Sequence, residues 1–244
     1  TLISVANLRN LPMLAQMGYS FVFYVTAAAI FFLLPAAFAS SFLSSLYSSE
    51  VGGVYLWVKG AFSRRIGLVA IWLQWIENVF YYPILLTFIV ENAVVIFFPG
   101  MAGSHLFMAT LIPFLFIIMT WVNQKGISFS VWISEACTWG GLILPVVLIL
   151  FFGVKYMMAN PQSLPSWGDF MPSSWGAIDN LTPAVVIFCG IEIATVHAAD
   201  VRDAKRIYPL AIVSSSVVIY LIMILGALTV LYYSSSDVDV DALT

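Results

Sequence analysis

The chain has 244 residues, of which 62% are hydrophobic and 9% charged, and its mean hydropathy is +1.01. Soluble domains carry about 25% charged residues. A soluble fold could not bury this much apolar surface, so lipid must surround most of the chain. Nine Lys and Arg against twelve Asp and Glu leave a net charge of −3 without a basic stripe, which excludes nucleic-acid binding. Cys137 and Cys189 lie in apolar stretches and give neither a disulfide framework nor a metal-binding spacing.

Six stretches are long and apolar enough to cross a bilayer, which takes about 20 residues of helix. In chain order they cover residues 19–47, 66–98, 105–122, 127–154, 181–199 and 208–233. A shorter apolar stretch at residues 1–17 is interrupted by Asn7, Arg9, Asn10 and Pro12, and we interpret it as a seventh, damaged span. Because the chain opens at Thr1 inside an apolar stretch, we expect further residues upstream.

Basic residues are concentrated in the loops on one side of these spans. Loops 48–65, 123–126 and 200–207 carry seven Lys and Arg, whereas the loops and tail on the opposite side carry Lys155 alone. The positive-inside rule places the first three loops in the cytoplasm of a multi-pass protein of the cell (inner) membrane. The outer loop at residues 155–180 holds Trp167 beside prolines, so we expect an interfacial segment, either an aromatic belt or a lid over a vestibule.

Two of the expected membrane helices are interrupted, and they run in opposite directions. The first contains the sequence Asn-Leu-Arg-Asn-Leu-Pro at residues 7–12, and the second contains Phe-Cys-Gly-Ile-Glu at residues 188–192. Pro12 cannot continue a helical ladder, and Gly190 lets the backbone leave the helix at low steric cost. Broken helices at matching positions of an inverted repeat indicate the midplane site of a transporter. Taken singly, each break could be a proline kink or a small-residue packing contact.

Two sequence elements resemble the amino acid–polyamine–organocation (APC) transporter superfamily. Residues 50–58 read Glu-Val-Gly-Gly-Val-Tyr-Leu-Trp-Val and are similar to the loop after that family's second helix. Residues 188–192, followed by Ile-Tyr-Pro-Leu-Ala at 207–211, are similar to its sixth helix and the exit from it. Within the superfamily, the run from Pro12 to Tyr19 most resembles the glutamate/γ-aminobutyrate antiporters.

This resemblance implies an all-α polytopic membrane protein with a LeuT-type inverted-repeat fold, of which the chain would supply helices 1–7 of about a dozen. Residues 1–154 would then be the first repeat, 155–180 the extracellular interfacial loop, and 181–244 the start of the second repeat. The chain departs from the family at Arg9 and Asn10, since we do not expect a cation at that break in most relatives.

Ionisable and aromatic residues inside the spans are the candidates for substrate and proton handling. Arg9 is either a bidentate anchor for a substrate carboxylate or the partner of Glu77 or Glu192 in a salt bridge. Glu192 is either a proton-sensitive gate or a structural cap, and Glu77 is either a proton relay or a structural hydrogen-bond partner. His197 is either a pH sensor or a solvated residue near the cytoplasmic end.

We therefore expect alternating-access transport of an amino acid by an exchanger, with acidic amino acids as candidate substrates. The expected substrate-binding residues are Asn7, Arg9, Asn10, Phe188, Cys189, Gly190, Ile191, Tyr81 and Tyr82, with Glu192, Glu77 and His197 for gating or proton transfer. A proton-coupled amino-acid or polyamine symporter is the alternative, and a seven-helix receptor is disfavoured because its tail would lie inside. No cofactor, metal or enzymatic activity is expected. The expected partners are the amino acid and lipid, and a homodimer is left open.

Overall fold

The computed structural model describes residues 7–47, 52–101, 103–124, 127–161, 165–172, 179–191 and 204–234, with the side chains of 127–130, 204–206 and 208 left aside. It divides into two compact units, one built from residues 1–53 and 136–244 and the other from 54–135. The predicted division into inverted repeats is a different partition of the chain and stays a prediction.

The first unit begins with a short helix that turns directly into a long one. Helix α2 (Asn10–Ala15) is followed by the 3-10 turn η1 (Gly18–Ser20), where Gly18 adopts a φ of 62°. That left-handed backbone suits glycine, which has no Cβ. The chain then continues through α3 (Phe21–Ala28), the π-turn η2 (Ala29–Leu33) and α4 (Leu34–Leu46).

A second π-turn interrupts another long helix in the same way. Helix α8 (Ile127–Cys137) leads through the π-turn η4 (Thr138–Ile143) into α9 (Leu144–Ala159). Both π-turns end two residues before a proline, Pro35 in α4 and Pro145 in α9. Proline cannot donate to the carbonyl four residues back and collides with it, so the wider turn lets each helix continue.

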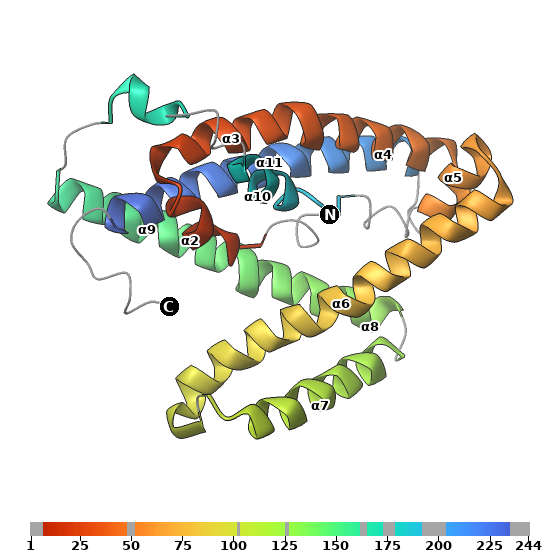
Figure 1. The fold of residues 1–244 in the computed structure, drawn as a ribbon, viewed down its shortest axis with the longest axis horizontal. Helices are drawn as coiled ribbons and strands as arrows, with labels where there is room; N and C mark the ends of the chain where they lie inside the picture. The colour runs from red at the N-terminus through yellow and green to blue at the C-terminus, as the bar shows by residue number, and fades with distance from the viewer. Residues whose placement is uncertain are drawn as a thin grey trace. The chain divides into compact units, whose positions relative to one another are not determined.

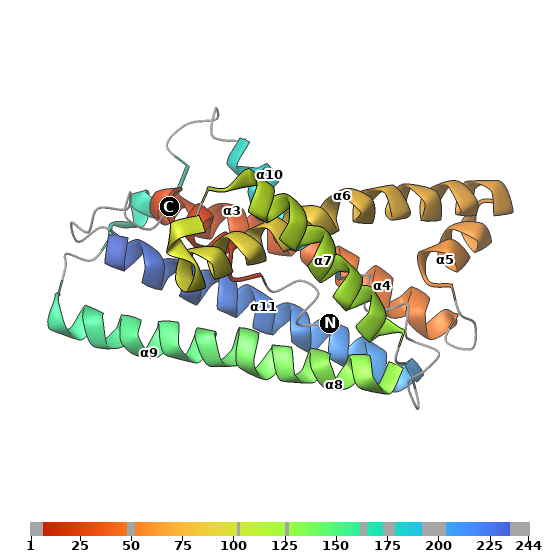
Figure 2. The same cartoon turned by 90° about the horizontal axis from the view of Figure 1, so that it is seen from below.

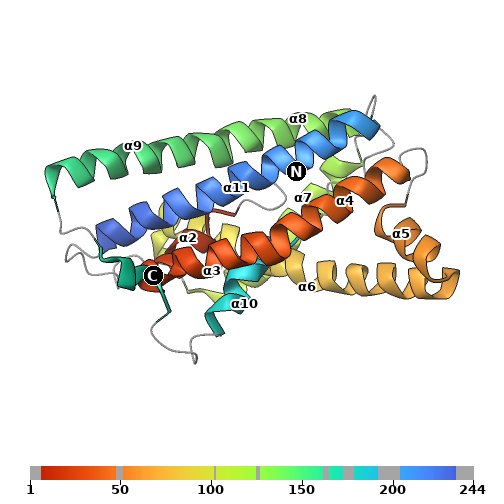
Figure 3. The ribbon, with the colours of Figure 1, turned by 90° about the horizontal axis from the view of Figure 1, so that it is seen from above.

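The core of the first unit forms where α11 (Ala204–Ser234) packs against α4, α9 and α2. Figure 3 shows α11 lying between α9 and the α3–α4 helix. The short helix α10 (Leu181–Val186) packs against α3. In the predicted outer loop, η5 (Trp167–Phe170) packs on η1 and α3, and the rings of Tyr19 and Phe170 lie with centroids 5.6 Å apart.

The second unit is built on the 34-residue helix α6 (Arg64–Phe97), which begins after the N-cap Ser63. Helix α5 (Val54–Ala61) packs on its first turns, and the 3-10 turn η3 (Pro99–Met101) leads into α7 (His105–Asn123), which returns along α6 (Figures 1 and 2). Gly67 permits the contact between α5 and α6, because a Cβ there would lie 3.2 Å from both Lys59 and Tyr55.

Five helices of the described residues are long and apolar enough to cross a membrane. They cover Gly18–Leu46, Arg64–Phe97, His105–Asn123, Val131–Ala159 and Pro209–Ser234. Five of the six predicted spans are thereby confirmed to within a few residues, and the fourth extends five residues further than predicted. The predicted span at 181–199 is helical only over Leu181–Val186 in its described part, which ends at Ile191.

Candidate functional site

The first predicted break precedes helix α2. Asn10 and Leu11 donate their backbone N–H groups to the carbonyls of Asn7 and Leu8, three residues back, at 3.1 Å. The side-chain oxygen of Asn7 accepts from the backbone N–H of Arg9, also at 3.1 Å. A regular α-helical hydrogen bond is present at Pro12, whose carbonyl accepts from the N–H of Gln16, four residues further on. Pro12 therefore lies in the first turn of the helix, where its missing N–H needs no partner.

Arg9 is the N-cap residue of α2, and its side chain is exposed. The side chains of Asn7 and Asn10, on either side of it, are half-buried. One guanidinium and two amides thus lie within four residues of sequence, and donors of these kinds suit a carboxylate. The predicted alternative partners of Arg9 are Glu77, which belongs to the second unit, and Glu192, which lies outside the described residues.

The second predicted break follows helix α10. The amides of Phe188 and Cys189 donate to Val185 and Val186, three residues back, at 3.0 and 3.2 Å, so the α-helical ladder ends at this point. Gly190 adopts a φ of 96°, in the left-handed region that favours glycine. Cys189 is exposed, whereas Phe188, Gly190 and Ile191 around it are buried.

Both breaks border one hydrophobic cluster. Leu11 and Leu14 of α2 join Ala184, Ile187, Phe188 and Ile191 in this cluster, and Leu8 packs against it. Helix α11 supplies Ile212, Ile219, Met223 and Ala227 to the same cluster. Phe188 is fully buried, so its ring packs in this cluster.

The remaining predicted residues stand apart from this cluster or outside the described chain. Tyr81, Tyr82 and Glu77 lie on α6 in the second unit, where all three are exposed and the two tyrosine rings meet edge-on with centroids 6.2 Å apart. Their predicted place beside the breaks stays a prediction. Glu192 and His197 lie outside the described residues.

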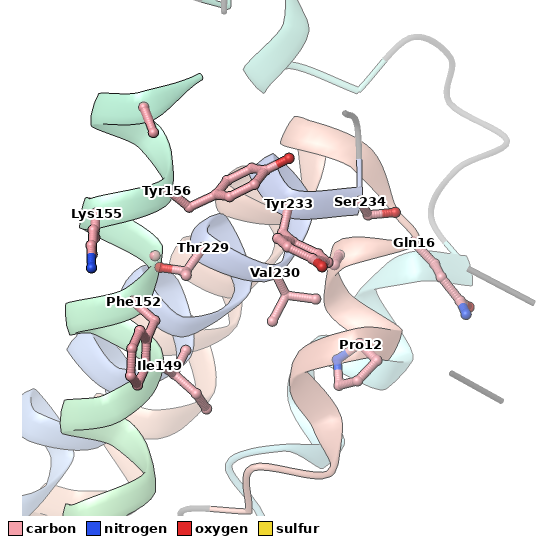
Figure 4. Close-up of a pocket in the computed structure, with 13 residues that line it drawn as sticks. Pro12, Gln16, Ile149, Phe152, Lys155, Tyr156, Thr229, Val230, Tyr233 and Ser234 are labelled. Carbon is pink, nitrogen blue, oxygen red and sulfur yellow. The ribbon is translucent and has the colours of Figure 1, made fainter. Parts of the chain in front are cut away.

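A cavity of about 940 Å³ opens in the first unit between α2, α9 and α11, and the sequence did not predict it. Figure 4 shows Pro12, Ile149 and Phe152 at one end, with Tyr156 and Ser234 at the other. The cavity shares the helix α2 with the first break. It is lined mainly by apolar side chains, with Gln16, Lys155 and Thr229 among the polar residues.

The ends of α9 and α11 beside this cavity are held together by tyrosines. The Tyr232 hydroxyl donates to the carbonyl of Asn160 at 2.8 Å, and the rings of Tyr156 and Tyr233 pack with centroids 4.9 Å apart. The only sequence signal for this arrangement was the position of these tyrosines at the predicted outer ends of two spans.

Comparison with known proteins identifies the family. The family model for amino acid permeases matches residues 1–240. The chain belongs to this family. An uncharacterized transporter of Legionella pneumophila is 32% identical over 238 residues, which are 96% of this chain and 51% of that protein. The fold class is therefore the all-α, LeuT-type fold that the resemblance implied, in a multi-pass membrane protein of a transporter family rather than an enzyme family.

More distant members of the family differ in what they exchange. A glutamate/gamma-aminobutyrate antiporter of Lactococcus lactis is 21% identical over 214 residues, which are 86% of this chain and 42% of that protein. A probable agmatine/putrescine antiporter of the same species is 26% identical over 223 residues, which are 87% of this chain and 45% of that protein. The chain thus spans about half the length of the curated relatives that it matches.

Proposed function

We propose that this chain forms part of a secondary active transporter that exchanges amino acids across the cell membrane by alternating access. The supporting observation is that α2 begins and α10 ends in hydrogen bonds to carbonyls three residues back, at residues 7–11 and 185–189, beside the same buried cluster. Freed backbone groups are tolerated at membrane depth only where they are buried in protein or line a cavity. Because the chain belongs to an amino acid permease family, we assign this pair of breaks to transport.

In this proposal the two breaks bind opposite ends of an amino-acid zwitterion. Arg9, with the amides of Asn7 and Asn10, holds the carboxylate, because a guanidinium binds a carboxylate in a bidentate manner. The carbonyls of Phe188, Cys189 and Gly190 hold the ammonium group. Ile191 lies at the second break, and Tyr81 and Tyr82 of the second unit stay predicted substrate contacts.

Three ionisable residues are proposed for gating and proton handling. Glu192 follows the second break in sequence, and Glu77 and His197 lie within predicted spans. Carboxylates and histidines inside membrane spans mark proton paths. A proton-coupled symporter would use these groups to bind the driving proton, whereas an exchanger would use them to set its pH dependence.

An acidic amino acid is the preferred substrate class, because Arg9 is exposed at the start of α2. A polyamine carries two or more positive charges, which Arg9 would repel. The agmatine/putrescine antiporter among the relatives makes polyamines the competing class.

A counterflow assay with the purified protein in proteoliposomes tests the proposal. Vesicles loaded with unlabelled amino acid or putrescine would be tested for uptake of the same labelled compound. We expect accumulation of labelled glutamate or aspartate that depends on internal amino acid. Accumulation only with putrescine would overturn the substrate class, and accumulation with no amino acid or polyamine would overturn the function.

A further inference from the structure

Tyr24 on α3 has a buried hydroxyl group without a partner. The residue is 3% exposed, and its hydroxyl oxygen makes no hydrogen bond to any described part of the chain. A buried hydroxyl that lacks a partner is a cost to the conformation that contains it. A partner for this oxygen can come from a rearrangement of the first unit, from a bound water molecule or from residues outside the described part of the chain.

Tyr24 lies on a face of α3 that belongs to the same buried cluster as the second break. Phe21, Tyr24, Val25 and Ala28 recur at helical spacing, so they form one face of α3. All four belong to the cluster that also contains Ala184, Ile187 and Phe188. Helix α10 packs on α3, as Figure 3 shows.

The same break releases a backbone acceptor. In a continued helix the Phe188 amide would donate to the carbonyl of Ala184, but here it donates to Val185 at 3.0 Å. Ala184 is fully buried. A hydroxyl donor without an acceptor and a carbonyl without its helical donor therefore lie on two elements that pack together.

We propose that Tyr24 is a positioning residue for exchange, whose hydroxyl donates to a released carbonyl of α10, that of Ala184, in the arrangement that alternates with the one seen here. The inference rests on the proposed function, because it requires two arrangements of the second break. A hydrogen bond that is present in only one of two states shifts their ratio by about tenfold. Tyr24 thus favours movement of the broken segment away from the conformation seen here.

Tyr220 offers a matched control. Its hydroxyl lies 3.0 Å from the Thr26 hydroxyl and joins α11 to α3. Tyr24→Phe and Tyr220→Phe delete the same atom, the first from α3 itself and the second from a residue of α11 that bonds to α3. Deleting the paired hydroxyl of Tyr220 should lower the melting temperature, whereas deleting the unpaired hydroxyl of Tyr24 should leave it unchanged or raise it.

The native Cys189 reports on the position of the break. It is exposed and outside any disulfide, and in a Cys137→Ser background it is the single thiol of the chain. We would measure the alkylation rate of Cys189 by N-ethylmaleimide, the melting temperature and the counterflow rate for both tyrosine variants. For Tyr24→Phe we expect an alkylation rate changed by at least about fivefold and slower exchange, without a loss of melting temperature.

Two results would overturn the role of Tyr24. A melting temperature lowered as in Tyr220→Phe, with unchanged alkylation, would show that the hydroxyl has a partner, such as water, in the present conformation. Wild-type alkylation and exchange in Tyr24→Phe would show that the hydroxyl does not act on the break. Absence of counterflow in the wild-type protein would instead count against the proposed function, and the alkylation rates would still decide whether Tyr24 moves the break.

Discussion

Gly153 sets the separation of α9 from α11, and replacing it by alanine tests the packing of the first unit. A Cβ at this position would clash with Cγ2 of Thr229. It would also lie 3.2 Å from both Cβ and Oγ1 of that residue. Carbon atoms pack at about 3.5–4.0 Å, so the two helices would have to separate. Overpacking of this kind costs about 1–3 kcal/mol.

Gly141 in the π-turn η4 provides a control on the same continuous helix. A Cβ there meets no atom within 4 Å, so alanine adds no clash. A glycine inside a helix destabilises it by about 0.5–1 kcal/mol relative to alanine, and Gly141→Ala should therefore be neutral or stabilising. Gly153→Ala should lower the melting temperature by about 2–12 °C, from the usual 2–4 °C per kcal/mol in chains of this length.

Thr229→Ser should relieve the clash that Gly153→Ala creates. It removes Cγ2 and keeps the hydroxyl, which donates to the carbonyl of Leu225 at 2.8 Å. The Gly153→Ala and Thr229→Ser pair should therefore show a favourable coupling of about 0.5–3 kcal/mol in a double-mutant cycle. Thermal unfolding of the purified protein, followed by tryptophan fluorescence, measures all four proteins. Equal melting of Gly153→Ala and Gly141→Ala, or additive effects in the cycle, would refute the close approach of α9 and α11.

Three further predictions concern the breaks. Arg9→Ala should abolish uptake of acidic amino acids, because it removes the carboxylate anchor, and Arg9→Lys should retain part of it; unchanged uptake by Arg9→Ala in proteoliposomes would rule out the anchor role. Gly190→Ala should cost about 1–2 kcal/mol, because its φ of 96° is unfavourable for a residue with a Cβ; a wild-type melting temperature would contradict this conformation. Glu192→Gln should shift the pH profile of exchange, and a profile that overlays the wild type would remove Glu192 from the gate.

The membrane spans could be predicted from the sequence because their signal is local. Runs of about 20 apolar residues are enough to specify a membrane helix, and the helix Arg64–Phe97 begins and ends within two residues of the predicted span 66–98. The two π-turns were not predicted, although Pro35 and Pro145 mark both. A proline in a membrane helix can be accommodated by a kink, a break or a π-turn, and local sequence does not select among them.

The candidate site was predictable in part for the same reason. Gly190 and Pro12 are local signals for the end and the start of a helix, and the structure places non-α-helical hydrogen bonding next to each. The burial of the Phe188 ring and the cavity beside Tyr156 depend on which helices pack together, which periodicity does not reveal. The unpaired hydroxyl of Tyr24 likewise becomes visible only once α3 is packed against its neighbours.

Substrate protection of a thiol at each break tests most directly whether the two breaks form one site. In the Cys137→Ser background, the native Cys189 reports on the second break. Asn7→Cys in a protein whose Cys189 is also changed to serine reports on the first. Maleimide labelling would be measured against increasing concentrations of the amino acid that supports counterflow. We expect the substrate to protect both thiols, with a higher half-saturating concentration in the Asn7→Cys protein, because that substitution removes one of the proposed carboxylate donors. Protection at one thiol alone, or at neither while exchange proceeds, would contradict a shared substrate site.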